Sequence, residues 1–202
     1  MPVTSTAGET ERFDLVASPI AHSFAGFWTF LLFAKQLQLQ LSRQWRFWLA
    51  RLGLLMVVAN LPDFDFVISF ALLGNDRLHH EFTHSLTLAV LVSLALSYVW
   101  RIARGFWPTF LIYFTAYGSH LLIDLFTGSR LGWTNSGSGI PLFWPWHRKF
   151  SSPLILVLGV LHLDLKALFS IENFRSGIYE LVTFGGITAV ILLIRSRHAH
   201  LN

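Results

Sequence analysis

The sequence contains no cysteine, and only 13% of its 202 residues are charged. The lack of cysteine excludes disulfides, thiolate metal sites, iron–sulfur clusters and cysteine nucleophiles. Soluble domains carry about 25% charged residues, so the low charge argues against an ordinary cytosolic globule. The first residues also lack the basic start, apolar run and cleavage site of a signal peptide. We therefore expect residues 1–14 to form a polar N-terminal tail.

Hydrophobic residues make up 53% of the chain and are arranged in stretches of membrane length. Each stretch has roughly 17–22 residues, enough to cross or nearly cross a bilayer core of about 30 Å as a helix. The stretches cover residues 15–34, 52–73, 84–100, 106–127, 153–171 and 178–194. The sequence therefore predicts an all-α, multi-pass membrane protein with about six apolar helices. Its single helical membrane domain would span residues 15–194, followed by a basic C-terminal tail at 195–202.

Histidine and aspartate residues interrupt these stretches, and alternating spans would bring them into one layer near one membrane face. The residues of this layer are His22, Asp63, Asp65, His79, His80, His84, His120 and Asp124. His120 and Asp124 are four residues apart, as are His80 and His84, and such pairs lie on one helix face. Pro62 breaks the helix beside the two carboxylates at 63 and 65, which allows both to turn inward.

Imidazole and carboxylate ligands without thiolate suit zinc, manganese or iron. Each residue alone has an ordinary structural explanation, as a hydrogen-bonded core histidine or a turn aspartate. The shared layer favours a metal site with more than one divalent ion, which would activate a water for attack on a phosphoester. No nucleophile elbow, P-loop or dinucleotide-binding turn competes with this interpretation. The basic residues are scattered, so no nucleic-acid partner is expected.

Two other functions use the same residues. A divalent-cation or proton transporter also places carboxylates and histidines inside the membrane. Such a path needs polar residues on both sides of the midplane, and the far side offers few. The third interpretation is a membrane scaffold whose metal is structural.

The motifs also resemble a known family. They are His22, LPDFD at 61–65, HHEFTHS at 79–85, GSHLLID at 118–124 and GIPLFWP at 139–145. This order resembles the YdjM-like family of inner-membrane, metal-dependent hydrolases, described in bacteria as LexA-regulated membrane proteins. That family is distantly similar to zinc-dependent phospholipases C, which implies zinc and a lipid-like phosphoester substrate.

The resemblance marks the same layer of histidines and aspartates as the metal ligands. His80 and Glu81 stand where the family has Arg-Gly, so the choice between His79 and His80 as ligand stays open. Asp65 and Glu81 are the candidate catalytic carboxylates. The resemblance implies an integral protein of a bacterial or archaeal inner membrane.

Lysine and arginine divide equally between the two sides of the six predicted spans. The loops on the side away from the histidines are shorter and denser in charge, which favours that side as cytoplasmic. The site would then face outward. Trp144 and Trp146 are typical of interfacial anchors on the site side; the alternative is that they form a wall of the site for a lipid-like substrate.

Overall fold

The computed structural model describes residues 15–37, 45–73, 82–161 and 170–199, and it is mostly helical. Its helices are α1 (Pro19–Leu32), α2 (Trp45–Asn60), α3 (Phe64–Leu73), the 3-10 helix η1 (Phe82–His84), α4 (Leu86–Val99), α5 (Phe106–Leu125) and α7 (Ile171–Ala199). The second predicted span is thus two helices, because Pro62 cannot continue the backbone hydrogen bonds of α2. α7 continues into the segment predicted as a C-terminal tail.

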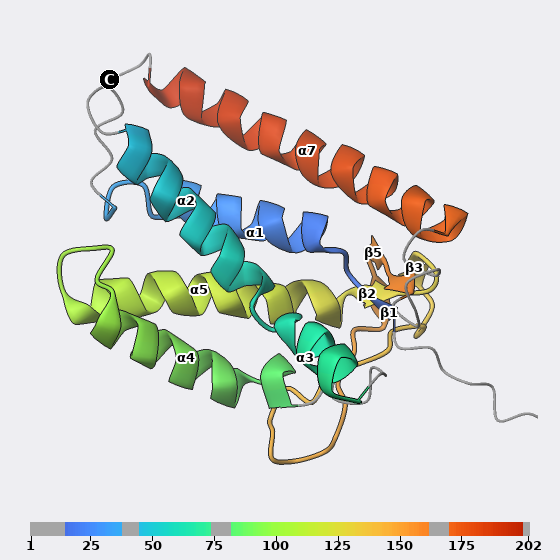
Figure 1. Cartoon of the computed structure of the whole chain (residues 1–202). Helices are drawn as coiled ribbons and strands as arrows, with labels where there is room; N and C mark the ends of the chain where they lie inside the picture. Colours follow the sequence, from blue (N-terminus) through green and yellow to red (C-terminus); the bar gives the residue numbers. More distant parts are fainter. Residues whose placement is uncertain (1–14, 38–44, 74–81, 162–169, 200–202) are drawn as a thin grey trace, which may run out of the picture.

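Four helices form the body of the bundle. α1 packs against α2, α5 and α7, and α5 also packs against α2 and α4 (Figure 1). The core between them includes Leu55 of α2 and Ile112, Tyr113 and Tyr117 of α5, all fully buried or nearly so. α1 and α4 begin at the end of the bundle where α2 and α5 finish. We call this end the site end.

Gly26 sets how closely α1 approaches α2. A Cβ atom at this position would lie 2.7 Å from the backbone oxygen of Leu55 and 2.7 Å from Cα of Met56. Only glycine permits such an approach of two helix backbones. The contact lies one turn after His22, so it also fixes the distance between the start of α1 and the end of α2.

Short strands, rather than a helix, follow α5. β1 (Leu15–Val16) pairs antiparallel with β6 (Val160–Leu161), and β2 (Thr127–Gly128) pairs parallel with β5 (Val157–Leu158). β3 (Gly132–Trp133) pairs antiparallel with β4 (Leu154–Ile155). The prediction of a membrane helix over 153–171 is therefore wrong for residues 154–161, and residues 162–169 lie outside the described chain. The backbone groups of this apolar run are satisfied by strand partners far away in the sequence.

Because residues 154–161 form strands and not a membrane-crossing helix, α7 runs in the direction opposite to the one predicted from six alternating spans (Figure 1). α7 begins at the site end and runs in the same direction as α1 (Figure 1). At the far end, Nη1 of Arg195 donates a hydrogen bond to the backbone oxygen of Leu31, at 2.9 Å. Six alternating spans would have put Arg195 at the site end.

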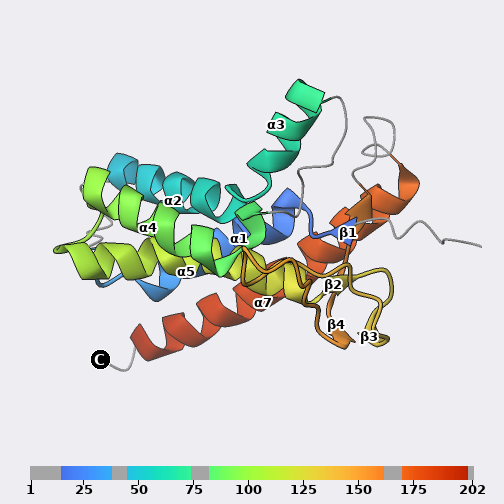
Figure 2. The same cartoon turned by 90° about the horizontal axis from the view of Figure 1, so that it is seen from below.

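Among the described residues, one helix is long and apolar enough to cross a membrane. It covers residues Ile171–Arg197, with a mean hydropathy of 1.9 in its most apolar window. The prediction of about six membrane-crossing helices is not supported by this measure. α3 projects from the bundle (Figure 2) and exposes Phe64, Val67 and Ile68.

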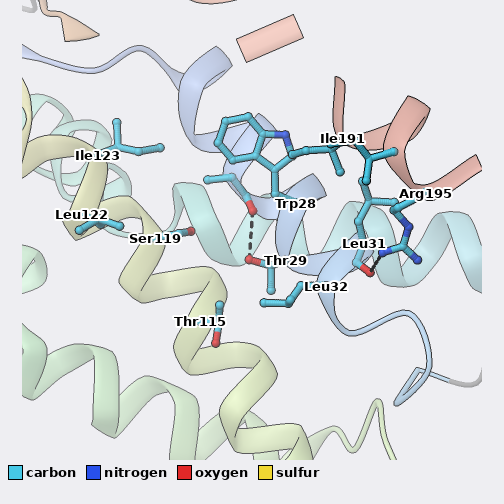
Figure 3. A pocket seen from close by; sticks show the side chains of 12 residues that line it. Trp28, Thr29, Leu31, Leu32, Thr115, Ser119, Leu122, Ile123, Ile191 and Arg195 are labelled. Atoms are coloured by element: carbon cyan, nitrogen blue, oxygen red, sulfur yellow. Dashed lines mark hydrogen bonds between the residues drawn. The ribbon is translucent and has the colours of Figure 1, made fainter. Parts of the chain in front are cut away.

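An apolar groove of about 500 Å³ separates α7 from α5 (Figure 3). Trp28 and Leu32 of α1, Leu122 of α5 and Ile191 of α7 are among its lining residues. Within the described chain, α7 is therefore held to the bundle mainly through α1 and the strands.

Candidate metal centre

Five of the predicted ligands converge at the site end of the bundle. His22 comes from the first turns of α1, Asp63 from the turn before α3, His84 from η1, and His120 and Asp124 from the last turns of α5. The three histidine side chains are fully buried, and that of Asp124 is 1% exposed. The side chain of Asp63 is 18% exposed, so it marks the side of the cluster nearest to solvent.

The polar atoms of this cluster lie within a few ångströms of one another. Nε2 of His84 and Nε2 of His120 are 3.2 Å apart, and each lies 3.4 Å from Oδ1 of Asp63. Oδ2 of Asp124 lies 3.0 Å from Nε2 of His120 and 3.6 Å from Nε2 of His84. Nε2 of His22 lies 3.5 Å from Oδ1 of Asp124 and 3.8 Å from Oδ2 of Asp63. All three histidines therefore turn the same ring nitrogen toward the carboxylates.

The backbone of α2 orients His120. Nδ1 of His120 lies 2.8 Å from the backbone oxygen of Ala59. A carbonyl oxygen only accepts, so Nδ1 carries the proton and the Nε2 lone pair of the neutral ring faces the cluster. The ring also stacks on His22, with centroids 3.6 Å apart. A hydrogen bond from the outer nitrogen of a histidine is the usual way to orient a metal-binding imidazole.

A carboxylate performs the same task for His84. Nδ1 of His84 lies 3.4 Å from Oδ2 of Asp65 and 3.0 Å from Oγ1 of Thr83. The Thr83 hydroxyl donates to Asp65, and the Tyr117 hydroxyl donates to the backbone oxygen of Thr83 at 2.7 Å. Asp65 therefore lies behind His84, on the side of the ring away from Asp63. The predicted roles of Asp65 as ligand and catalytic carboxylate stay predictions, whereas its contact favours orienting His84.

The cluster shifts the pKa values of Asp63 and His84 in opposite directions. Burial alone would raise the pKa of the Asp63 carboxyl, but the imidazoles of His120 and His84 hold that pKa well below its usual value. Burial alone would lower the pKa of His84, but the carboxylates of Asp63 and Asp65 raise it. Both shifts favour the charged form of the group. A divalent cation binds ionised carboxylate and deprotonated imidazole, so it would compete with protons for His84.

The donor atoms fit a metal ion better than they fit one another. Within the described chain, both ring nitrogens of His22 and Oδ1 of Asp124 are buried without a hydrogen-bond partner. Contacts of 3.5–3.8 Å are too long for hydrogen bonds, and each unpaired buried group costs about 1–3 kcal/mol. Ligands at the usual zinc distances in a tetrahedron lie about 3.3–3.4 Å apart. Asp63, His84 and His120 have this spacing.

The described residues form two possible ligand groups, and they share one histidine. One group is His22, His120 and Asp124, and the other is Asp63, His84 and His120. Oδ1 of Asp63 faces His84 and His120 whereas Oδ2 faces His22, and Asp124 divides its two oxygens in the same way. Each carboxylate therefore contacts histidines of both groups.

Three predicted site residues, His79, His80 and Glu81, lie outside the described residues. Two further residues of the site, Thr83 and Glu180, were not predicted from the sequence. Thr83 lies within a recognised motif, but its contact with Asp65 depends on how η1 folds. Glu180 is a fully buried carboxylate in α7 that binds the start of α1. The sequence signal for Glu180 was its position as a carboxylate within an apolar stretch.

A protein-family model matches nearly all of the described chain. The family model described as "YdjM inner membrane protein" matches residues 18–199. The chain belongs to the YdjM family. The match extends from the N-cap of α1 to the end of α7, so it includes the segment after residue 150 that the motifs leave out. Searches of curated proteins and of solved structures gave no match. The family description supports a place in the inner membrane.

Proposed function

We propose that this YdjM-family protein is a membrane-bound, metal-dependent hydrolase that cleaves a phosphoester of a lipid or another membrane-near molecule. The observation that carries the proposal is the convergence of His22, Asp63, His84, His120 and Asp124 in one buried cluster. Hydrogen-bonded core residues would satisfy one another, whereas in the described chain both ring nitrogens of His22, Oδ1 of Asp63 and both carboxylate oxygens of Asp124 are buried without a hydrogen-bond partner.

The residues divide into direct ligands and residues that orient them. Zinc is the first candidate, with manganese and iron as alternatives, because the donors are imidazole and carboxylate. His22, Asp63, His84, His120 and Asp124 would hold the ions, because each of the two carboxylates faces both His22 and His84. When bound, such ions supply an activated water and neutralise the charge of a phosphoester. Asp63 is the ligand nearest to solvent and marks the entry for substrate.

The bundle exposes apolar side chains on several helices, which supports a place within the bilayer. Phe47 of α2, Val99 of α4 and Trp107 of α5 are 65–81% exposed, and α7 exposes large aliphatic residues along its length. Monomeric soluble proteins rarely expose contiguous apolar surfaces of this kind. α7 would cross the membrane, and the shorter helices beside it would complete a multi-pass bundle in which α3 lies at the interface.

The distribution of positive charge supports a site that faces outward. Because α7 runs parallel to α1, Arg195 and Arg197 join the arginines and lysine at the far end, and Arg175 moves to the site end. The described basic residues of the far end are Lys35, Arg46, Arg51, Arg101, Arg104, Arg195 and Arg197, against Arg130, Arg148, Lys149 and Arg175 at the site end. Excess positive charge favours the far end as cytoplasmic.

The absence of cysteine allows a direct test of this orientation. Arg130 at the site end and Arg104 at the far end are both exposed. Each is replaced by cysteine in a separate variant. In intact bacterial cells, a membrane-impermeant maleimide should label Arg130→Cys, and it should label Arg104→Cys only after lysis. The reverse pattern would show that the site faces the cytoplasm.

The function is tested first by elemental analysis of detergent-purified protein. We expect zinc, manganese or iron in the wild type at one ion per chain or more, and loss of metal in His84→Ala and Asp124→Ala. His147→Ala is the matched control, because this histidine is exposed and distant in sequence from the cluster. Release of phosphate-containing product from phospholipid and small phosphodiester substrates should then disappear in the same two variants.

The other outcomes identify the rival functions. Metal that remains tightly bound without turnover on any ester would favour a structural metal. Metal flux into proteoliposomes that depends on Asp124 would favour a transporter. A wild type that binds no metal, even after reconstitution, would refute the proposed hydrolase.

A further inference from the structure

A buried carboxylate connects the last helix to the start of the first. Glu180 lies in α7, in a stretch of apolar composition, and it is 0% exposed. Its Oε1 accepts a hydrogen bond from the backbone N–H of Ser18 at 2.9 Å, and its Oε2 accepts one from the Ser18 hydroxyl. Glu180 thus binds both the backbone N–H and the hydroxyl of the residue that begins α1.

These donors belong to the end of α1 that carries His22. Ser18 is the N-cap of α1, and its hydroxyl also accepts from the backbone N–H of Ile20 at 3.2 Å. The first N–H groups of a helix have no partner within the helix, and a negative charge there is favourable. The N–H of His22 makes an early hydrogen bond of α1, to the oxygen of Ser18 at 3.4 Å. The position of the His22 ring therefore depends on a turn that Glu180 holds.

A purely structural link between the two helices exists elsewhere and has no charge. Two turns further along α7, Oγ1 of Thr188 accepts a hydrogen bond from Nε1 of Trp28 at 2.7 Å. A carboxylate in an apolar membrane helix is costly, and such residues are associated with function. Attachment of α7 to α1 alone does not require a charged side chain, as the hydrogen bond between Trp28 and Thr188 shows.

We propose that Glu180 is a positioning residue that holds the first turn of α1 so that His22 can bind a metal ion. The proposal rests on the metal site proposed above, and it assigns to α7 a part in forming that site. It also separates the two ligand groups, because His22 belongs to one of them and not to the other.

The first test uses Co²⁺ titrations followed by visible absorption, with Glu180→Gln as the isosteric variant and Glu180→Ala as the stronger one. We expect the affinity of the His22-dependent ion to fall about 10–100-fold, the usual effect of losing the partner of a ligand. His22→Ala should show the same spectral change. Adding Glu180→Gln to His22→Ala should cause no further loss, because both act on one ligand.

Thr188→Val is the matched control, since it removes the uncharged hydrogen bond between α7 and Trp28 of α1 and leaves the first turn of α1 intact. The proposal is overturned if Glu180→Gln binds Co²⁺ like the wild type. It is also overturned if Thr188→Val weakens binding equally, or if Glu180→Gln weakens binding further in the His22→Ala background.

A second measurement does not depend on metal. Hydrogen exchange of the metal-free protein should become faster in the peptide that begins α1 in Glu180→Gln, and it should be unchanged there in Thr188→Val. Unchanged exchange in Glu180→Gln would overturn the proposal. A wild type that binds no Co²⁺ or zinc refutes the hydrolase, whereas the exchange experiment still decides whether Glu180 holds this turn.

Discussion

Replacing Asp65 by Asn distinguishes a metal ligand from a residue that orients one. The substitution keeps the size of the side chain and removes its charge, leaving Nδ1 of His84 without the carboxylate that lies 3.4 Å away. A buried hydrogen bond to a charged group contributes about 1.5–3 kcal/mol. Loss of a residue that orients a metal-binding histidine typically costs 10–100-fold in metal affinity. At about 1.4 kcal/mol per tenfold, the two estimates agree.

The assay is a competition titration of zinc between the protein and a chromophoric chelator. We expect Asp65→Asn to bind zinc about 10–100-fold more weakly than the wild type while keeping the same number of ions. Asp63→Asn is the control for a direct ligand and should lose more affinity or a whole ion. If Asp65→Asn loses an ion as Asp63→Asn does, Asp65 is itself a ligand and the orienting role is wrong. If its affinity is unchanged, the contact with His84 has no effect on metal binding.

Two further predictions concern stability, measured by thermal unfolding in detergent. Gly26→Ala should destabilise the protein by about 1–3 kcal/mol, because its Cβ would lie 2.7 Å from backbone atoms of Leu55 and Met56. Gly53→Ala, where nothing lies within 4 Å, should instead stabilise by about 0.5–1 kcal/mol; equal effects would show that the close approach of α1 and α2 is not needed. Removing metal with a chelator should lower the melting temperature of the wild type, since ion at 100 times its dissociation constant stabilises by about 2.7 kcal/mol. His120→Ala should show no such change, and a wild type that melts identically with and without chelator would count against a bound ion.

The sequence was sufficient to predict that His22, Asp63, His84, His120 and Asp124 meet, from the spacing within each motif and the alternating direction of the first four spans. His120 and Asp124 share a helix face through their spacing of four, and Pro62 predicted the break that turns Asp63 toward the cluster. The distinction between Asp63 and Asp65 was not predictable in this way. It depends on η1 bringing His84 between them, with Nε2 toward one carboxylate and Nδ1 toward the other.

The segment after residue 150 shows why hydropathy alone gave the wrong topology. Residues 154–161 are apolar enough for a buried helix or strands, and a short apolar run does not distinguish the two. β6 pairs with β1, directly before α1, and β5 pairs with β2, directly after α5. The strands therefore hold the ends of the two helices that carry His22 and Asp124, and α7 then places Glu180 on the start of α1. Residues 154–161, which were expected to belong to a membrane-crossing helix, instead hold the helix ends that carry the candidate metal ligands. Glu180 can reach the start of α1 because α7 begins at the site end (Figure 1).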